Sequence, residues 1–278
     1  MPRIPLLSLL CFAVSSPAGS LHAQEHAELE VWQMISTYLT KEAEIALGEL
    51  PEPSNAAAQR EREFCAVVVQ LSQQTVTEAR IEDVERRLGA LVAANNQDDI
   101  GRASLYLLGR VAQVFRATPD NALAATYYRQ LIAMPDNDHW ANLDRVKLAL
   151  LEIYMLPAES PADRIAAVES LIPGVHDRIT LRDLHRLAAR GLMFYELDPA
   201  RALEHLLTSD SIGGLRGMPA ADQVVQIANL AWELGRKELS NTFREKLRDQ
   251  YPRDARIYLL DQRAAGEPVP EGTAGGGQ

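Results

Sequence analysis

The chain has 278 residues, of which 47% are hydrophobic and 24% are charged, the composition of an ordinary globular protein. Its formal net charge of -10 and its pI of about 5.2 argue against nonspecific nucleic-acid binding, because a surface that follows a phosphate backbone has to be basic. We therefore expect no nucleic-acid partner, and the length allows one or two domains.

The N-terminus has the layout of a secretory signal peptide. Arg3 precedes an apolar run, Ile4–Val14, which is followed by small and polar residues. This run is well short of the roughly 20 residues that cross a bilayer. We expect cleavage after Ala23, which makes residues 1–23 the signal peptide, and cleavage after Ser20 is the alternative. The mature protein would then be periplasmic or secreted, with no integral membrane segment.

Cleavage would leave Cys65 as the single cysteine of the mature chain, so no internal disulfide can form. The residues on both sides of Cys65 are apolar, in the stretch FCAVVVQL. This setting favours a small buried residue over a reactive nucleophile.

From residue 25 onward, apolar residues recur every three or four positions, and no stretch shows the period of two that is typical of strands. The pattern predicts an all-α protein with roughly eleven or twelve helices. Segments rich in Pro, Gly, Asn and Asp separate the helices. Good N-cap residues stand ahead of three of them, namely Ser54, Asp120 or Asn121, and Ser160.

The chain is predicted to have three parts after the signal peptide. Residues 24–99 form N-terminal helices, and residues 100–265 form a region of helical hairpins. Residues 266–278 are rich in Gly and Pro and lack periodic apolar residues, which favours a disordered tail.

Aromatic residues mark a repeat in the hairpin region. Phe115, Tyr154, Tyr195 and Trp232 each stand near the end of a longer helix that precedes a turn and a shorter helix. Their intervals are 39, 41 and 37 residues (154−115, 195−154 and 232−195). A period of this size is typical of helical-hairpin repeats, which stack because a single hairpin cannot bury its apolar face alone.

The last unit, AWELGRKELSNTFREKLRDQYP, has small residues at Ala228 and Ser240, a glycine at Gly235 ahead of the turn, and Pro252 after the second helix. In these features it resembles the tetratricopeptide repeat, and the resemblance extends over residues of about 100–252. It implies antiparallel helical hairpins stacked as a short right-handed solenoid, with the first helices lining a groove.

The sequence contains no G-x-S-x-G, H-E-x-x-H or G-x-x-x-x-G-K-[ST] motif, so we predict no catalytic, cofactor-binding or metal-binding residues and no cofactor. His176, His185 and His205 lack the spacing of metal ligands on one helical face. We interpret these histidines as solvated residues near helix ends.

Four residues are candidates for a partner-binding column along the groove, because each lies nine positions before the aromatic residue of its unit: Tyr106, Arg145, Arg186 and Gln223. The planar guanidinium of arginine is suited to carboxylates, so the two arginines could clamp an acidic group. The alternative is that both arginines pair with neighbouring Glu or Asp residues.

These features predict a non-catalytic, exported scaffold or adaptor that binds a protein or peptide in the cell envelope. The alternative is a helical accessory module or degenerate enzyme of peptidoglycan or polysaccharide processing. Glu159-Ser160 and Gly191–Met193 are similar to stretches of lytic transglycosylases, although Phe194 stands where that family has Gln. Aromatic residues make up only 6% of the chain, which favours protein over glycan as the partner.

Overall fold

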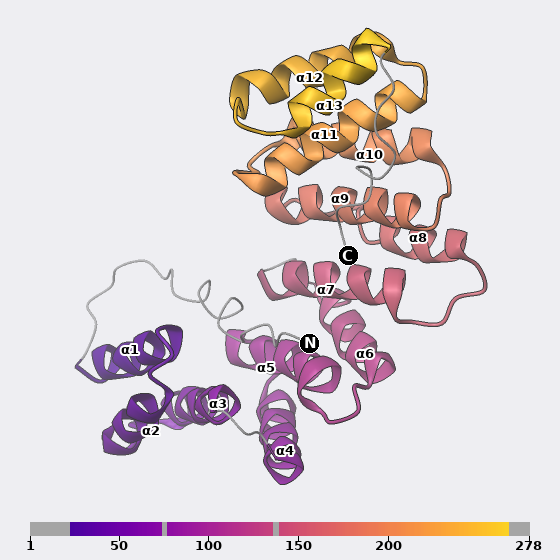
Figure 1. The fold of residues 1–278 in the computed structure, drawn as a ribbon. Coiled ribbons are helices and arrows are strands. Elements are labelled where there is room, and N and C mark those ends of the chain that lie inside the picture. The colour runs from indigo at the N-terminus through magenta and orange to yellow at the C-terminus, as the bar shows by residue number, and fades with distance from the viewer. Residues whose placement is uncertain (1–22, 74–76, 136–138, 267–278) are drawn as a thin grey trace. The chain divides into compact units, whose positions relative to one another are not determined.

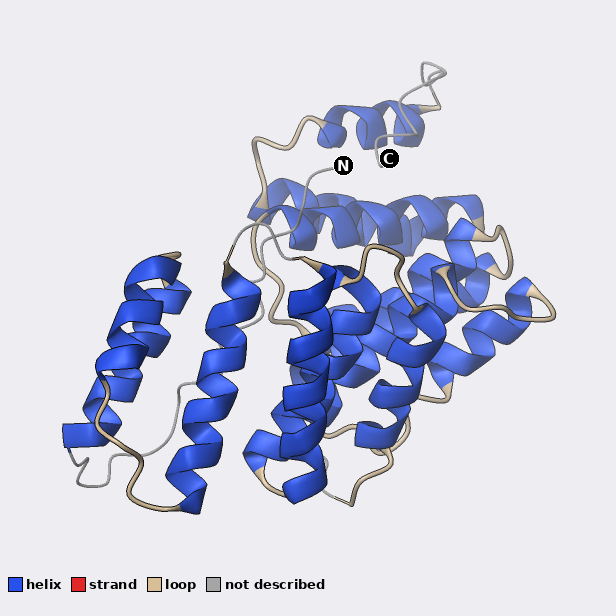
Figure 2. Ribbon diagram, turned by 90° about the horizontal axis from the view of Figure 1, so that it is seen from below, coloured by secondary structure: helices blue, strands red, loops and turns tan. Residues whose placement is uncertain are grey.

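A computed structural model describes residues 23–73, 77–135 and 139–266. All regular elements in these ranges are helices and none is a strand, so the all-α prediction is confirmed for the described part of the chain (Figure 2). Nearly all of the predicted signal peptide and of the predicted disordered tail lies outside these residues.

The chain divides into two compact units, residues 1–144 and 145–278, and the division falls inside helix α7. The first unit contains, in order (Figure 1), α1 (Ala23–Ser36), α2 (Thr40–Glu49), α3 (Ala56–Ser72), α4 (Glu78–Ala94), α5 (Asp99–Arg110), the π-helical turn η2 (Val111–Phe115), α6 (Asn121–Ile132) and the start of α7 (His139–Tyr154). The second unit continues with the rest of α7, α8 (Pro161–Glu169), α9 (Arg178–Phe194), α10 (Pro199–Ile212), α11 (Met218–Glu233), α12 (Lys237–Gln250) and α13 (Arg256–Ala265).

Short polar side chains start several of these helices. Asp120 accepts a hydrogen bond from the Leu123 amide, and Ser160 accepts one from Asp163, as predicted. At α3 the prediction was wrong by one residue, because Asn55, not Ser54, accepts from the Ala58 amide. Each bond satisfies an amide that has no carbonyl partner in the first helical turn.

One large apolar cluster in the core of the first unit is drawn from α1 to α7. Cys65 is buried in it, on the face of α3 that also carries Phe64, Val68 and Leu71. The expectation of a buried cysteine is therefore confirmed. In the second unit one cluster joins α7, α8 and α9, and another extends from α8 to α13.

A hydrogen bond that recurs about every 40 residues defines the hairpin repeat. At η2 and at the ends of α7, α9 and α11, an amide donates to the carbonyl five residues earlier: Arg116 to Val111, Leu156 to Leu151, Leu197 to Leu192, and Arg236 to Ala231, at 3.3, 2.9, 2.9 and 2.7 Å. The four carbonyl residues are buried. Their intervals are 40, 41 and 39 residues (151−111, 192−151 and 231−192), so the backbone follows a more regular period than the aromatic side chains do.

The same bond also joins the Leu39 amide to the Met34 carbonyl between α1 and α2, at 2.9 Å. Hairpin turns of this kind are thus present in the predicted N-terminal segment 24–99 as well.

Small residues allow the paired helices to approach closely. Ser240 on α12 donates its hydroxyl hydrogen to the Ala228 carbonyl on α11 at 2.8 Å, and both residues are buried, which agrees with their expected place at a helix crossing. Ion pairs link the second helices of successive hairpins. Glu169 on α8 pairs with Arg201 on α10, and Glu204 on α10 pairs with Arg236, the residue before α12, at 3.4 Å.

The crossing of α5 and α6 yields a stability prediction. A Cβ atom added at Gly109 would lie 2.2 Å from Cε1 of the fully buried Tyr128 ring, whereas one added at Gly89 on α4 would meet nothing within 4 Å. Gly109→Ala should therefore lower the free energy of unfolding by about 1–3 kcal/mol, the usual effect of overpacking.

Gly89→Ala is the matched control, because it also replaces a glycine inside a helix. It should raise the stability by about 0.5–1 kcal/mol through the lower entropy cost of ordering alanine. Urea unfolding of both variants measures the difference, and equal changes would contradict the close approach of α5 and α6.

Candidate binding groove and histidine pair

A groove of about 550 Å³ lies on the second unit, lined by the first helices of its hairpins, α7, α9 and α11, together with single residues of α10 and α13. Its apolar floor includes Leu150, Leu187 and Val225. Charged side chains also line it: Asp183, Arg186, Arg190, Asp222 and Arg256. Three arginines against two aspartates make this region basic within an acidic chain.

The three arginines differ in how firmly neighbouring acids hold them. Arg256 donates to Asp254 and to Asp222, each at 2.6 Å. This pairing lowers the pKa of the Asp254 carboxyl and raises the pKa of the Arg256 guanidinium. Arg256 is therefore a fixed part of the groove wall.

Neighbouring carboxylates hold Arg186 and Arg190 much less firmly. Arg186 lies 3.7 Å from Asp183, and Arg182 donates to the same carboxylate oxygen at 2.9 Å. Arg190 is exposed and makes no ion pair with any residue that the structure describes. The two arginines stand one helical turn apart on α9, so two guanidinium groups are available to a ligand at one place.

The structure brings only one of the four predicted column residues into the groove. Arg186 lines it and is partly exposed. Tyr106, Arg145 and Gln223 are buried, with exposed fractions of 1%, 9% and 3%. Gln223 accepts a hydrogen bond from Ser209 at 3.0 Å, and Tyr106 packs against Trp140 in the first unit. The binding role of the column as a whole stays a prediction.

The buried position of Gln223 follows from a shift in register, whereas Arg145 is buried although it lies six residues before Leu151 and so keeps the register of Arg186. Arg186 lies six residues before Leu192, the residue whose carbonyl accepts the turn bond of its hairpin. Ala231 accepts the turn bond of the next hairpin, and the residue six positions before it on α11 is Val225, which lines the groove. Counting from Trp232 gives Gln223 instead, because this aromatic follows its turn residue by one position, whereas Tyr195 follows Leu192 by three.

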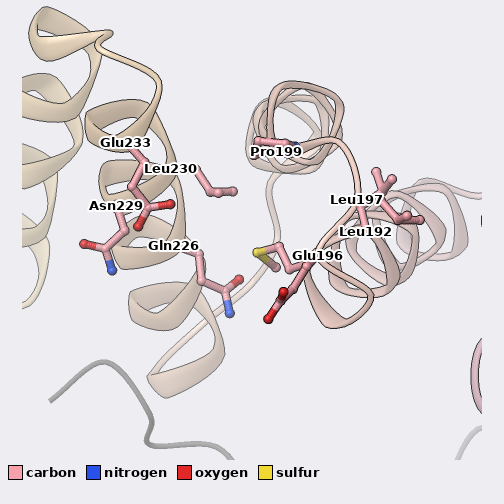
Figure 3. A pocket seen from close by; sticks show the side chains of 9 residues that line it. Leu192, Glu196, Leu197, Pro199, Gln226, Asn229, Leu230 and Glu233 are labelled. Carbon is pink, nitrogen blue, oxygen red and sulfur yellow. The ribbon is translucent and has the colours of Figure 1, made fainter. Parts of the chain in front are cut away.

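A second pocket, of about 420 Å³, lies where α9 ends and α10 begins, opposite α11. Figure 3 shows the α11 side chains Gln226, Asn229 and Glu233 on one side of it and Glu196 on the other. Its walls are mostly apolar, from Leu192, Met193, Leu197, Pro199 and Leu230. Gln226 also lines the groove, so the groove and the pocket meet at this side chain.

Glu196 has a backbone conformation that glutamate rarely adopts, with a φ of +51°. The corresponding position in the next hairpin is Gly235, with a φ of +72°. A left-handed conformation costs a residue with a side chain roughly 1–2 kcal/mol. Glu196 and Glu233 are exposed and form no ion pair within the described residues. The pocket therefore has two carboxylates at its rim that are free to meet a cation.

A chain of three side chains links α8, α9 and α10. His185 Nδ1 lies 2.8 Å from His205 Nδ1, and His205 Nε2 lies 2.9 Å from a Glu169 carboxylate oxygen. Arg201 binds the other oxygen of Glu169. The interpretation of His185 and His205 as solvated residues was therefore wrong, because the packing of α9 on α10 brings the two rings together. His176, in contrast, is exposed.

Burial lowers the pKa of both histidines. For His185 the second cause is the neighbouring His205, and for His205 it is Arg201. The short distance between the Nδ1 atoms allows one hydrogen between them but not two, so doubly protonated rings would repel each other.

Residues that resemble parts of lytic transglycosylases have structural roles in this fold. Ser160 caps α8. Gly191 is buried on α9, where an added Cβ would lie 2.5 Å from Cδ1 of Ile165 on α8. Within the described ranges there is no group of three or more His, Cys, Asp or Glu side chains that could hold a metal ion. No helix in those ranges has the length and hydropathy needed to cross a membrane.

No protein-family model matches the chain, and no curated protein matches it. Among solved structures, it is similar to the crystal structure of NprR in complex with its cognate peptide NprX. The match has 12% sequence identity and a TM-score of 0.41, and it covers 91% of this chain and 76% of that chain.

The histidine pair predicts a loss of stability in mild acid. Because the pKa of each histidine is lower in the folded protein than its unfolded value of about 6.5, the unfolded chain binds more protons below that pH. The contribution of the pair is fully present above about pH 6.5 and is lost as the pH falls toward the folded pKa. The free energy of unfolding should therefore drop between pH 7.5 and pH 5.5.

In the double variant His185→Gln with His205→Gln this drop should become smaller, whatever the variant's stability at pH 7.5. His176→Gln removes an exposed histidine and should leave the drop unchanged. Urea unfolding at the two pH values measures both. An equal drop in the wild type and the double variant would contradict the role of the pair.

Proposed function

We propose that the mature protein is an exported, non-catalytic scaffold or adaptor that binds a protein or peptide segment in the groove of the second unit. The observation that carries this proposal is the pair Arg186 and Arg190. Both line the groove, and neighbouring carboxylates neutralise little of their positive charge. Like charges four residues apart destabilise a helix slightly. A carboxylate bound between them would remove this repulsion and form charge-assisted hydrogen bonds.

The arrangement of the hairpins supports the same proposal. Consecutive first helices line the groove, and this repeats the layout implied by the resemblance to the tetratricopeptide repeat. We propose that the hairpins continue this stacking as a short right-handed solenoid. In such an array the concave face is built by the first helices and is the usual site of partner binding.

Charge reversal in the groove tests the proposal. Arg186→Glu with Arg190→Glu should weaken capture of the partner from a cell-envelope extract by at least about thirtyfold, since loss of a buried charge contact typically costs 2 kcal/mol or more. The helical circular dichroism spectrum should stay unchanged, because neither side chain is buried.

The matched control is Arg216→Glu with Arg253→Glu. Both arginines are exposed in the second unit, form no ion pair within the described residues, and line neither the groove nor the pocket. The control should capture the same protein as the wild type. If no captured protein depends on the groove pair, or if the control loses it equally, the groove is not the binding site.

Export is a separate part of the proposal and has its own test. The expected signal peptide ends at Ala23, or at Ser20 in the alternative. The intact mass of protein recovered from the periplasm or medium should therefore lack residues 1–23 or 1–20. A mature protein that still begins at Met1 would contradict export by this signal.

A further inference from the structure

The groove and the pocket adjoin at Gln226 and are both lined by α9 and α11, and we call the two together the crevice. Their charges are of opposite sign. The groove contributes Arg186 and Arg190, and the pocket contributes Glu196 and Glu233. A ligand that fills both therefore meets a basic site and an acidic site in a fixed order.

The pocket at the acidic end fits a long basic side chain. Its walls include Leu192, Pro199 and Leu230, which can cover the methylene groups of Lys or Arg. The two glutamates at the rim can then bind the ammonium or guanidinium group. A purely apolar side chain would leave both carboxylates without a counter-charge, and an acidic one would be repelled.

The separation of the two sites sets the spacing in the ligand. Arg190 and Glu196 are six residues apart on α9 and its turn (196−190). At a rise of 1.5 Å per residue, the part from Arg190 to the end of α9 at Phe194 covers about 6 Å, and the two turn residues bring the separation to roughly 9 Å. An extended chain covers this distance in about three residues, at roughly 3.3 Å each.

The helix that carries the arginines, α9, is not the last helix in the groove lining, which also includes residues of α7 and α11. Beyond Arg186 the groove is continued by Val146 and Leu150 of α7. A bound chain therefore has room on both sides of the arginines, which favours an acidic side chain over a terminal carboxylate as the group that they hold.

We infer that the crevice binds an extended peptide segment that carries an acidic and a basic side chain about three residues apart. The acidic side chain binds Arg186 and Arg190, and the basic side chain enters the pocket between Glu196 and Glu233. This inference rests on the proposed function and specifies the class of ligand for the same site.

The test is a selection from a library of random heptapeptides, displayed with fixed flanking residues at both ends, on the full mature chain. The wild type should enrich peptides with an acidic and a basic residue about three positions apart. Arg186→Glu with Arg190→Glu should lose the preference for the acid and keep that for the base. Glu196→Gln with Glu233→Gln should do the opposite, and Arg216→Glu with Arg253→Glu should enrich the same peptides as the wild type.

One enriched peptide, synthesised in several forms, then distinguishes the source of the carboxylate. Replacing its acidic residue by Gln should weaken binding to the wild type about tenfold and have little effect on the variant Arg186→Glu with Arg190→Glu. Amidating the peptide's C-terminus should change nothing. If amidation abolishes binding, a terminal carboxylate is the ligand and the inference about an internal side chain is wrong.

The other outcomes separate the inference from the function on which it rests. Peptides that are enriched without an acid–base pair, but still depend on the groove arginines, would overturn the inference and leave the scaffold proposal standing. If the selection enriches no peptide, or only peptides that bind the groove variants as well as the wild type, both are overturned.

Discussion

The structure depends on one backbone hydrogen bond, in which an amide donates to a carbonyl five residues earlier and so reverses the chain inside a helical hairpin. Because the carbonyl residue is buried at Val111, Leu151, Leu192 and Ala231, these four reversals are anchored in the core and the next helix must return along the previous one. The hairpins that result expose one apolar face, which only a neighbouring hairpin can cover. The groove exists because the first helices end in the same way and therefore present equivalent side chains side by side.

The fold class and the approximate period could be predicted from the sequence, because both follow from local patterns. Apolar spacing identifies helices without tertiary information, and Ser160 and Asp120 satisfy amides only a few residues away. The register could not be predicted in this way. The aromatic side chains follow the turn residues Val111, Leu151, Leu192 and Ala231 by four, three, three and one positions. A large side chain can fill the same space from neighbouring positions, so aromatics are imprecise markers, and counting from them leads to Tyr106 and Gln223, which are buried.

The polar features were harder to predict, because their partners are distant in the sequence. His185 and His205 are twenty residues apart, and Glu169 lies thirty-six residues before His205. No spacing rule within one helix links them. The same holds for the crevice, whose acidic end combines a turn residue of one hairpin, Glu196, with a helical residue of the next, Glu233. Arg186 was found from the sequence because Tyr195 follows its turn residue by three positions. The same offset of Tyr154 leads to Arg145, which is buried, so the register alone does not identify groove residues.

The left-handed backbone at Glu196 has a consequence for how this protein could change over time. Glycine would be the less strained residue there, as Gly235 is in the following hairpin, so drift toward a more stable fold favours loss of the carboxylate. A lineage that keeps an acidic residue at this turn would be under selection to bind the ligand. A lineage that acquires glycine there would no longer be under that selection. The identity of this single residue in related chains could therefore be used to sort those that retain the same ligand from those that have exchanged it.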